Sequence, residues 1–134
     1  MSKKVYAYVI ADILHVGHIR FLQEAKALGD HLIVGVLTDS ATMEKKPMPV
    51  IPFQERVRII EALRYVDQVV MQEHYSPLEN VQKYKPDILV ESGSHKEQPA
   101  NEFVESYGGK VFILPYYQHQ SSTKIKNLIR ERGV

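Results

Sequence analysis

Short runs of consecutive apolar residues alternate along the chain with longer segments of mixed polarity. Apolar runs of four to eight residues, rich in β-branched and aromatic side chains, are typical of strands covered on both faces. They predict strands at 4–11, 31–37, 68–71, 87–90 and 110–114. The intervening segments predict helices at 16–28, 53–65, 77–84, 99–107 and 121–132. Residues 38–52 contain three prolines and are predicted to be a loop, and loops of that length in compact domains usually serve function.

The strict alternation of strand and helix predicts an α/β fold. Such an order favours right-handed crossovers and a doubly wound, five-stranded parallel sheet with helices on both faces. We find no internal repeat or linker and expect a single domain over residues 1–134. Ligands of doubly wound sheets bind beyond the carboxyl ends of the strands. We therefore expect the chemistry in the loops after the first, second, fourth and fifth strands.

Composition excludes several classes of protein. The 17 Lys and Arg residues against 16 Asp and Glu give a net charge of +1, which favours no nucleic-acid partner but permits one small anion in one pocket. The absence of cysteine excludes disulfides, thiolate catalysis and iron–sulfur clusters. No apolar run is long enough to span a membrane, and the N-terminus does not resemble a signal peptide. We expect a cytoplasmic protein with no membrane partner.

The junction between the first strand and the first helix carries the strongest chemical signal. His15 and His18 are three residues apart, so they share a helix face, and Gly17 between them lets a ligand approach the backbone. A helix N-terminus offers unpaired N–H groups to an anion, and imidazoles add donors, with positive charge if protonated. The junction therefore predicts a phosphate site. The alternatives are a capping and a surface histidine, or a metal site that lacks an evident third ligand.

Residues 12–18 (DILHVGH) resemble the HxGH signature of the cytidylyltransferase-like nucleotidyltransferase superfamily. Four further segments extend the resemblance in the same order: 28–36, 38–47, 54–67 and 121–125. The resemblance implies a Rossmann-like fold and transfer of a nucleotidyl group from CTP or ATP to a phosphate or phosphonate, with release of pyrophosphate. It also implies a homodimer.

The resemblance implies roles for particular residues. The implied catalytic residues, which would stabilise the α-phosphorus or reach the phosphates, are His15, His18 and Lys46. The implied nucleotide-binding residues are Ala11, Asp12, Gly17, Lys45, Ser92, Ser121, Ser122 and Thr123. The candidate substrate-binding residues are Asp39, Arg56, His95, Tyr116 and His119, of which the last three lie where the chain departs from the family pattern. Mg²⁺ would accompany the nucleotide on its phosphates, and no metal ligand is assigned to the protein.

Each of these roles has a structural alternative. Lys45 and Lys46 suit a solvated loop equally. The hydroxyls of residues 121–123 cap the last helix in either interpretation. Arg56 and Arg64 suit ordinary surface pairs with Glu61 and Glu55.

The chain departs from the family pattern at three places. Ala11 precedes the aspartate where relatives often have an aromatic residue, a variant that weakly favours a phosphonate acceptor. Ser94 replaces the aspartate of the loop after the fourth strand, beside His95 and Lys96, which leaves the choice between CTP and ATP open. Residues 116–119 (YYQH) stand where an arginine is usual, so His119 would replace it only in part, and the aromatic pair would stack on a base or pack.

The favoured function is transfer of CMP to a phosphorylated or phosphonate small molecule. Transfer of AMP is the first alternative, because residues 76–90 and 108–111 resemble the adenylyltransferase that activates heptose phosphate for the lipopolysaccharide core. A nucleotide-binding protein without catalysis is the rival from another class, motivated by the missing arginine and aspartate. A nucleotide hydrolase ranks last, because the histidines are the only candidates for a water-activating base.

Overall fold

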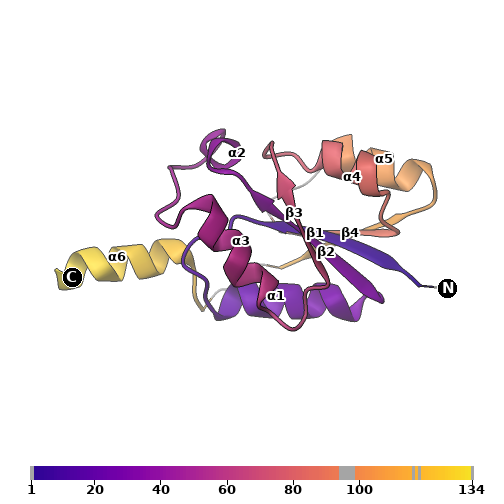
Figure 1. Ribbon diagram of the computed structural model, residues 1–134. Helices are drawn as coiled ribbons and strands as arrows, with labels where there is room; N and C mark the ends of the chain where they lie inside the picture. Colours follow the sequence, from indigo (N-terminus) through magenta and orange to yellow (C-terminus); the bar gives the residue numbers. More distant parts are fainter. Residues whose placement is uncertain (1, 94–98, 116, 118, 134) are drawn as a thin grey trace.

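The computed structural model describes residues 2–93, 99–115, 117 and 119–133. Its centre is a five-stranded sheet in the order β3-β2-β1-β4-β5, and every neighbouring pair is parallel (Figure 1). The strands are β1 (Lys4–Val9), β2 (His31–Leu37), β3 (Gln68–Gln72), β4 (Ile88–Ser92) and β5 (Lys110–Leu114). The predicted doubly wound parallel sheet is confirmed.

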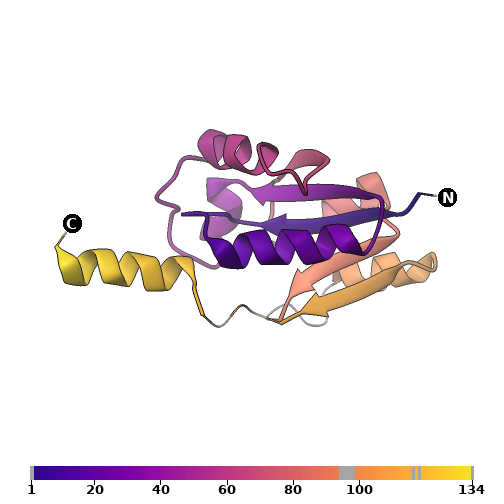
Figure 2. The same cartoon turned by 90° about the horizontal axis from the view of Figure 1, so that it is seen from below.

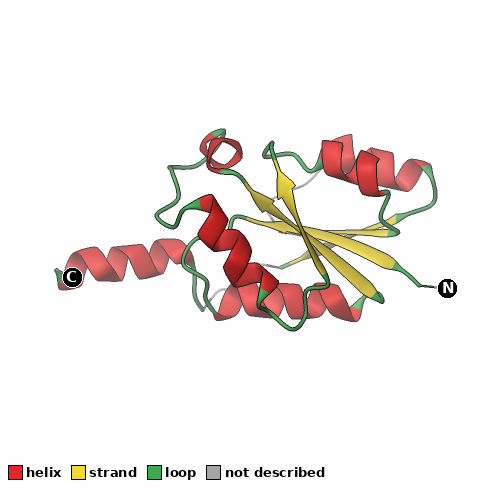
Figure 3. Ribbon diagram, viewed as in Figure 1, coloured by secondary structure: helices red, strands yellow, loops and turns green. Residues whose placement is uncertain are grey.

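Helices cover both faces of this sheet (Figure 3). They are α1 (Val16–Ala27), α2 (Asp39–Met43), α3 (Phe53–Glu61), α4 (Leu78–Tyr84), α5 (Pro99–Ser106) and α6 (Ser122–Arg132). Successive residues of β1 point to opposite faces: Val5 and Ala7 join the core beneath α1 and α3, and Tyr6 and Tyr8 join the core beneath α2, α4 and α5. Helix α6 projects away from the sheet (Figures 1 and 2).

The element boundaries differ from the predicted ones in three informative places. The first strand ends at Val9, because the chain turns out of the sheet before Ala11. Helix α3 ends at Glu61 rather than 65, and its C-cap Ala62 is followed by a turn in which the Val66 N–H donates to the Leu63 carbonyl. The prediction of an unbroken loop over 38–52 is wrong, because α2 occupies Asp39–Met43.

Helix α2 begins with a local capping signal. The Thr38 side chain accepts a hydrogen bond from the Ala41 N–H at 3.0 Å, as an N-cap residue does. Ala41 is buried against the core on that face of the sheet. The capping contact and this burial together hold a helix of five residues that is too short to be stable alone.

Strand β1 is the topological switch point of the sheet. The chain leaves β1 toward β2 on one side and returns to β4 on the other. The segments after β1, β2 and β4 therefore meet beyond the carboxyl ends of these strands. None of the helices in the described ranges has the length and apolar character needed to cross a membrane.

Candidate active site

A cavity of about 960 Å³ lies at the carboxyl ends of the strands. Its walls come from the segment after β1, the start of α1, residues 46–50, the end of β4 and the start of α6. Many of the site residues predicted from the sequence line it: Asp12, His15, Gly17, His18, Lys46, Ser92, His119, Ser121, Ser122 and Thr123. His95 and Tyr116 lie outside the described residues.

The two histidines cap α1 reciprocally. His15 is the N-cap residue, and its Nδ1 accepts from the Gly17 N–H at 2.9 Å. The Nδ1 of His18 accepts from the His15 N–H at 3.2 Å, and the two ring centroids lie 4.0 Å apart. A nitrogen that accepts a hydrogen bond carries no proton, so each neutral ring has its proton on Nε2. Both rings therefore keep an Nε2–H donor for a ligand.

Burial keeps these imidazoles neutral. Burial, with a smaller contribution from the neighbouring His15, lowers the pKa of His18 to about 4, while Asp12 opposes the change. Burial also lowers the pKa of His15. At neutral pH the pair therefore offers two N–H donors rather than two positive charges.

Gly17 is required by the His15 cap as well as by access to the backbone. A Cβ at this position would lie 2.6 Å from His15 Cε1 and 2.9 Å from its Nδ1. Such distances are far inside van der Waals contact, so any side chain here would push the imidazole out of its capping position.

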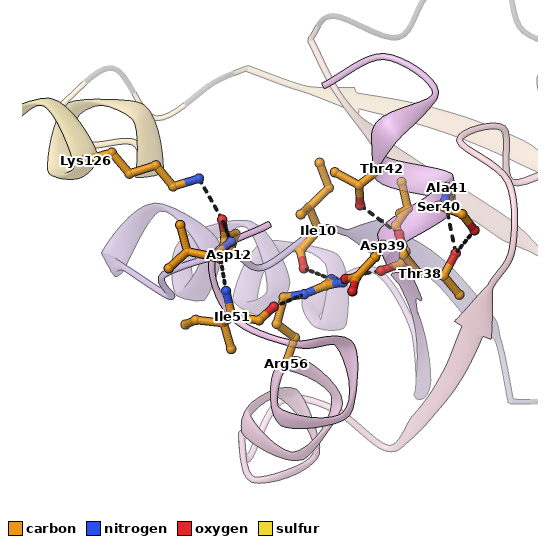
Figure 4. A network of polar contacts seen from close by, with 12 residues as sticks. Ile10, Asp12, Thr38, Asp39, Ser40, Ala41, Thr42, Ile51, Arg56 and Lys126 are labelled. Atoms are coloured by element: carbon orange, nitrogen blue, oxygen red, sulfur yellow. Dashed lines mark hydrogen bonds and ion pairs between the residues drawn. The ribbon is translucent and has the colours of Figure 1, made fainter. Parts of the chain in front are cut away.

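Asp12 joins three segments of the site (Figure 4). Its carboxylate accepts from the Val50 and Ile51 N–H groups, each at 3.0 Å, and from Lys126 Nζ at 2.6 Å. Burial alone would raise the pKa of this carboxyl, but the Lys126 hydrogen bond and the two amides outweigh burial and lower it. Asp12 was expected to bind the nucleotide. In the structure its carboxylate instead accepts hydrogen bonds from groups of the protein itself.

The backbone around Asp12 is strained. Ala11 and Ile13 have φ of 59° and 54°, a left-handed conformation that costs a non-glycine residue about 1–2 kcal/mol. Isoleucine, with its β-branched side chain, rarely adopts it. The two left-handed residues turn Asp12 toward residues 50 and 51, which explains why β1 ends before this segment.

Arg56 is fully buried, so its interpretation as a surface arginine is wrong. Its Nε donates to the Ile51 carbonyl at 2.9 Å, and its Nη1 donates to the carbonyls of Ile10 and Leu37 at 2.7 and 2.8 Å. Its Nη2 pairs with Asp39 Oδ1 at 2.7 Å (Figure 4).

These contacts tie together the ends of β1 and β2, the start of α2 and the far end of the 44–52 segment. Arg56 and Asp39 were expected to bind substrate. In the structure their side chains bind each other, and Arg56 also binds main-chain carbonyls. Arg64, the other arginine taken for a surface ion pair, instead donates to the Tyr65 hydroxyl at 3.0 Å.

The first turn of α6 closes the cavity from the other side. The Ser121 hydroxyl accepts from the Lys124 N–H at 3.0 Å and so caps the helix. The Ser122 hydroxyl donates to the Asp12 carbonyl, and Lys126 one turn later pairs with the Asp12 carboxylate. Asp12 thereby brings the N-termini of α1 and α6 to the same cavity.

The two lysines of the 44–52 segment differ in position. Lys46 lines the cavity, whereas the Lys45 ammonium lies 5.4 Å from the centroid of the Tyr75 ring. The cavity residues that the sequence interpretation missed include Lys126 and Arg20, whereas Tyr117 belongs to the aromatic pair considered for base stacking. Lys126 follows Ser122 by four residues on a helix, a spacing that places both on one face.

A magnesium ion in this cavity would keep most of its ligands on the phosphates of the nucleotide. Within the described part of the chain, no group of three His, Asp or Glu residues is placed to hold a metal ion. The Asp12 carboxylate in the cavity is already engaged by two amides and Lys126. A Mg²⁺ ion that keeps phosphate and water ligands makes no demand for a larger protein cage.

The cytidylyltransferase-like family model matches residues 9–128. The chain belongs to the cytidylyltransferase-like family. The family predicted from the five motifs is thereby confirmed. Two curated relatives, both called bifunctional protein HldE, come from Syntrophotalea carbinolica and Pelobacter propionicus. Each is 38% identical over 125 residues, which is 90% of this chain and 26% of the relative. The chain thus spans about a quarter of the length of these relatives.

Two solved structures share the fold of this chain. The lipopolysaccharide core biosynthesis protein from Thermoplasma volcanium superposes with a TM-score of 0.75 at 30% identity, covering 90% of this chain and all of that one. Pantoate-beta-alanine ligase from Francisella tularensis superposes with a TM-score of 0.58 at 16% identity, covering 99% of this chain and 71% of that one, and shows the shared fold alone.

Proposed function

We propose that this chain transfers a nucleotidyl group from a nucleoside triphosphate to a phosphorylated small molecule and releases pyrophosphate. The observation that carries the proposal is the convergence of two capped helix N-termini, α1 and α6, on one cavity. That cavity also holds two imidazole Nε2–H donors and the ammonium groups of Lys46 and Lys126. These donors match a polyphosphate, whose charge a single helix N-terminus would balance only in part.

The reaction needs little covalent help from the protein. An oxygen of the acceptor phosphate forms a bond to the α-phosphorus, the bond from that phosphorus to the bridging oxygen breaks, and pyrophosphate leaves with the electron pair. His15 and His18 donate from Nε2 to the α-phosphate oxygens, whose charge rises in the transition state. The α6 N-terminus and Lys126 bind the leaving pyrophosphate. A Mg²⁺ ion bound to the nucleotide would neutralise part of the charge on its phosphates.

We further propose that ATP is the donor and a sugar phosphate of the lipopolysaccharide-core type is the acceptor. The likeness to the lipopolysaccharide core biosynthesis protein, at 30% identity, supports this class of acceptor. The resemblance of residues 76–90 and 108–111 to the heptose-phosphate adenylyltransferase supports ATP over the CTP donor that the sequence favoured. The rival function, nucleotide binding without transfer, depends on residues 94 and 116, which lie outside the described part of the chain.

Pyrophosphate release tests both steps of the proposal. The chain is incubated with Mg²⁺ and each of ATP, CTP, GTP and UTP, against heptose phosphates, other sugar phosphates, glycerol phosphate and simple phosphonates. We expect release with ATP and a sugar phosphate. Release with CTP and a phosphonate would overturn the donor and acceptor but keep the transferase. Tight nucleotide binding without release from any pair would overturn the transferase in favour of the rival.

A further inference from the structure

The start of the 44–52 segment is held against the corner that follows β3. Glu44, the C-cap residue of α2, accepts a hydrogen bond from the Tyr75 N–H at 3.2 Å, and its other carboxylate oxygen lies 3.3 Å from His74 Nδ1. The Lys45 ammonium lies 5.4 Å from the centroid of the Tyr75 ring. Glu44 and Lys45 thus both contact residues 74 and 75, which we call the β3 corner.

A buried polar network supports the β3 corner from below. Gln72, the last residue of β3, is buried, and its amide donates to the carbonyls of His74 and Tyr75 at 3.1 and 3.2 Å. Its Oε1 accepts from the hydroxyl of the fully buried Tyr6 at 2.6 Å, and Asn80 on α4 donates to that hydroxyl at 2.9 Å. A buried amide bonded in this way is costly to displace. The β3 corner is therefore a fixed support for the 44–52 segment.

Lys45 and Lys46 point in different directions because the last turn of α2 continues through them. Their N–H groups donate to the Thr42 carbonyl at 3.2 and 2.9 Å, so the helical turn extends to the residue before Pro47. Neighbouring residues of a helix point about 100° apart. With Lys45 held over the Tyr75 ring, Lys46 is directed toward the cavity, which it lines.

We propose that Glu44 and Lys45 are positioning residues that act through Lys46, and that Lys46 is the lysine of this pair that binds the polyphosphate. The inference rests on the proposed function for the identity of the ligand, and it gives Lys45 a role other than the nucleotide binding that its motif implied. The Glu44 side chain is 43% exposed, so its contacts add little to the stability of the fold. Their effect is to preset the direction of Lys46, which reduces the freedom that its side chain loses when a phosphate binds.

Amide hydrogen exchange of the ligand-free chain, followed by NMR, tests the contact with the β3 corner independently of any reaction. Glu44→Ala removes the acceptor of the Tyr75 N–H, and we expect the amides of Tyr75, Lys45 and Lys46 to exchange about fivefold faster or more. Glu79→Ala is the matched control, because Glu79 also contacts His74, at 3.5 Å, but from α4. It should leave these exchange rates unchanged. Equal rates in Glu44→Ala and the wild type would overturn the proposal.

Affinity for inorganic tripolyphosphate, measured by titration calorimetry with Mg²⁺, tests which lysine binds phosphate. Lys46→Met removes the proposed phosphate ligand, and we expect binding to be about tenfold weaker. Glu44→Ala and Lys45→Met keep the Lys46 ammonium but release its direction, so each should weaken binding by a smaller factor of about three. Glu79→Ala, which also removes a negative charge near the β3 corner, should not weaken binding.

Double variants separate positioning from direct binding. If Glu44 and Lys45 act through Lys46, then Glu44→Ala and Lys45→Met have no further effect in the Lys46→Met background, and each double variant binds tripolyphosphate as weakly as Lys46→Met. Further weakening by Lys45→Met in that background would overturn the proposal, because Lys45 would then bind phosphate itself. A wild-type chain that does not bind tripolyphosphate would overturn the binding role of Lys46 together with the proposed function. Normal binding with unchanged exchange rates in Glu44→Ala would overturn the positioning role and leave the proposed function standing.

Discussion

Two helix N-termini face the same cavity, but the protein holds them very differently. The start of α1 is embedded: His18 is largely buried, and Arg56 and Asp12 behind it are buried and hydrogen-bonded on several sides. The start of α6 meets the rest of the site at Asp12, and no residue of that helix is buried. We call the first turn of α1, which packs against buried residues, the embedded turn. We call the first turn of α6, which contacts the rest of the site at Asp12, the attached turn.

The difference assigns separate tasks to the two regions. The embedded turn keeps the histidine donors at fixed positions, as stabilisation of a transition state requires. The attached turn adds donors for the remaining phosphates, and it is held by few contacts within one chain. Changes in the embedded region should therefore cost more stability than changes in α6.

Removing the buried guanidinium should have the largest effect. Arg56→Ala leaves three carbonyls and the Asp39 carboxylate without their donor, so we expect a loss of about 3–5 kcal/mol in the free energy of unfolding. Urea unfolding measures it. Arg58→Ala, two residues away on the exposed side of α3, should change stability by less than about 0.5 kcal/mol. Equal effects of the two variants would contradict the positioning role of Arg56.

Acid should destabilise the embedded turn through His18. The unfolded chain binds a proton at His18 near pH 6.5, and the folded chain binds it only near pH 4, so stability falls as the pH drops through that window. The difference between these pKa values corresponds to about 3 kcal/mol.

Comparison of urea unfolding at pH 7 and pH 4.5 measures this loss. We expect His18→Gln to lose less stability than the wild type over this range, and His31→Gln, at the other end of the sheet, to lose as much. Parallel losses in all three proteins would show that His18 titrates normally in the folded chain.

Turnover should depend on both histidines. His15→Ala or His18→Ala removes an Nε2–H donor, and we expect pyrophosphate release to fall by about a hundredfold or more. His31→Ala should keep nearly normal turnover, because His31 lies outside the cavity and bonds Gln68. Near-normal turnover in both cavity variants would refute their part in catalysis.

The attached turn should show the smallest effect on stability. Lys126→Met removes a partly exposed ion pair with Asp12, and we expect a loss of about 1 kcal/mol from urea unfolding. The Asp12 pKa should rise, because the hydrogen bond from Lys126 lowers it. Arg132→Met, in the last turn of the same helix, should change stability by less than about 0.5 kcal/mol. If Lys126→Met lowered the free energy of unfolding as much as Arg56→Ala, the proposed difference between the two regions would be contradicted.

The order of elements and the family were predictable because their signals are local. Apolar runs marked the five strands, and the HxGH loop and the 121–125 segment carried their motifs within a few residues. The burial of Arg56 was not predicted, because it depends on backbone carbonyls up to 46 residues away in the sequence. One sequence signal was present: Arg56 occupies the apolar stripe of α3 between Phe53 and Ile60.

The structural role of Asp12 could not be predicted from the sequence either. Its partners at residues 50, 51 and 126 become neighbours only when the sheet brings distant segments to one edge. The neutral state of the histidines likewise follows from burial, which a motif does not report. Helix α2 could have been predicted, because Thr38 precedes it as an N-cap residue. The prolines at 47, 49 and 52 instead favoured a loop over the whole segment.

The central claim is that the two helix N-termini form one triphosphate site. Thermal unfolding of the wild-type chain with Mg²⁺ and each of ATP, CTP, GTP and UTP tests it most directly. A nucleotide at a hundred times its Kd should stabilise the fold by about 2.7 kcal/mol and raise the unfolding midpoint by several degrees. We predict such a shift with ATP. No shift with any of the four nucleotides would contradict a triphosphate site in this cavity.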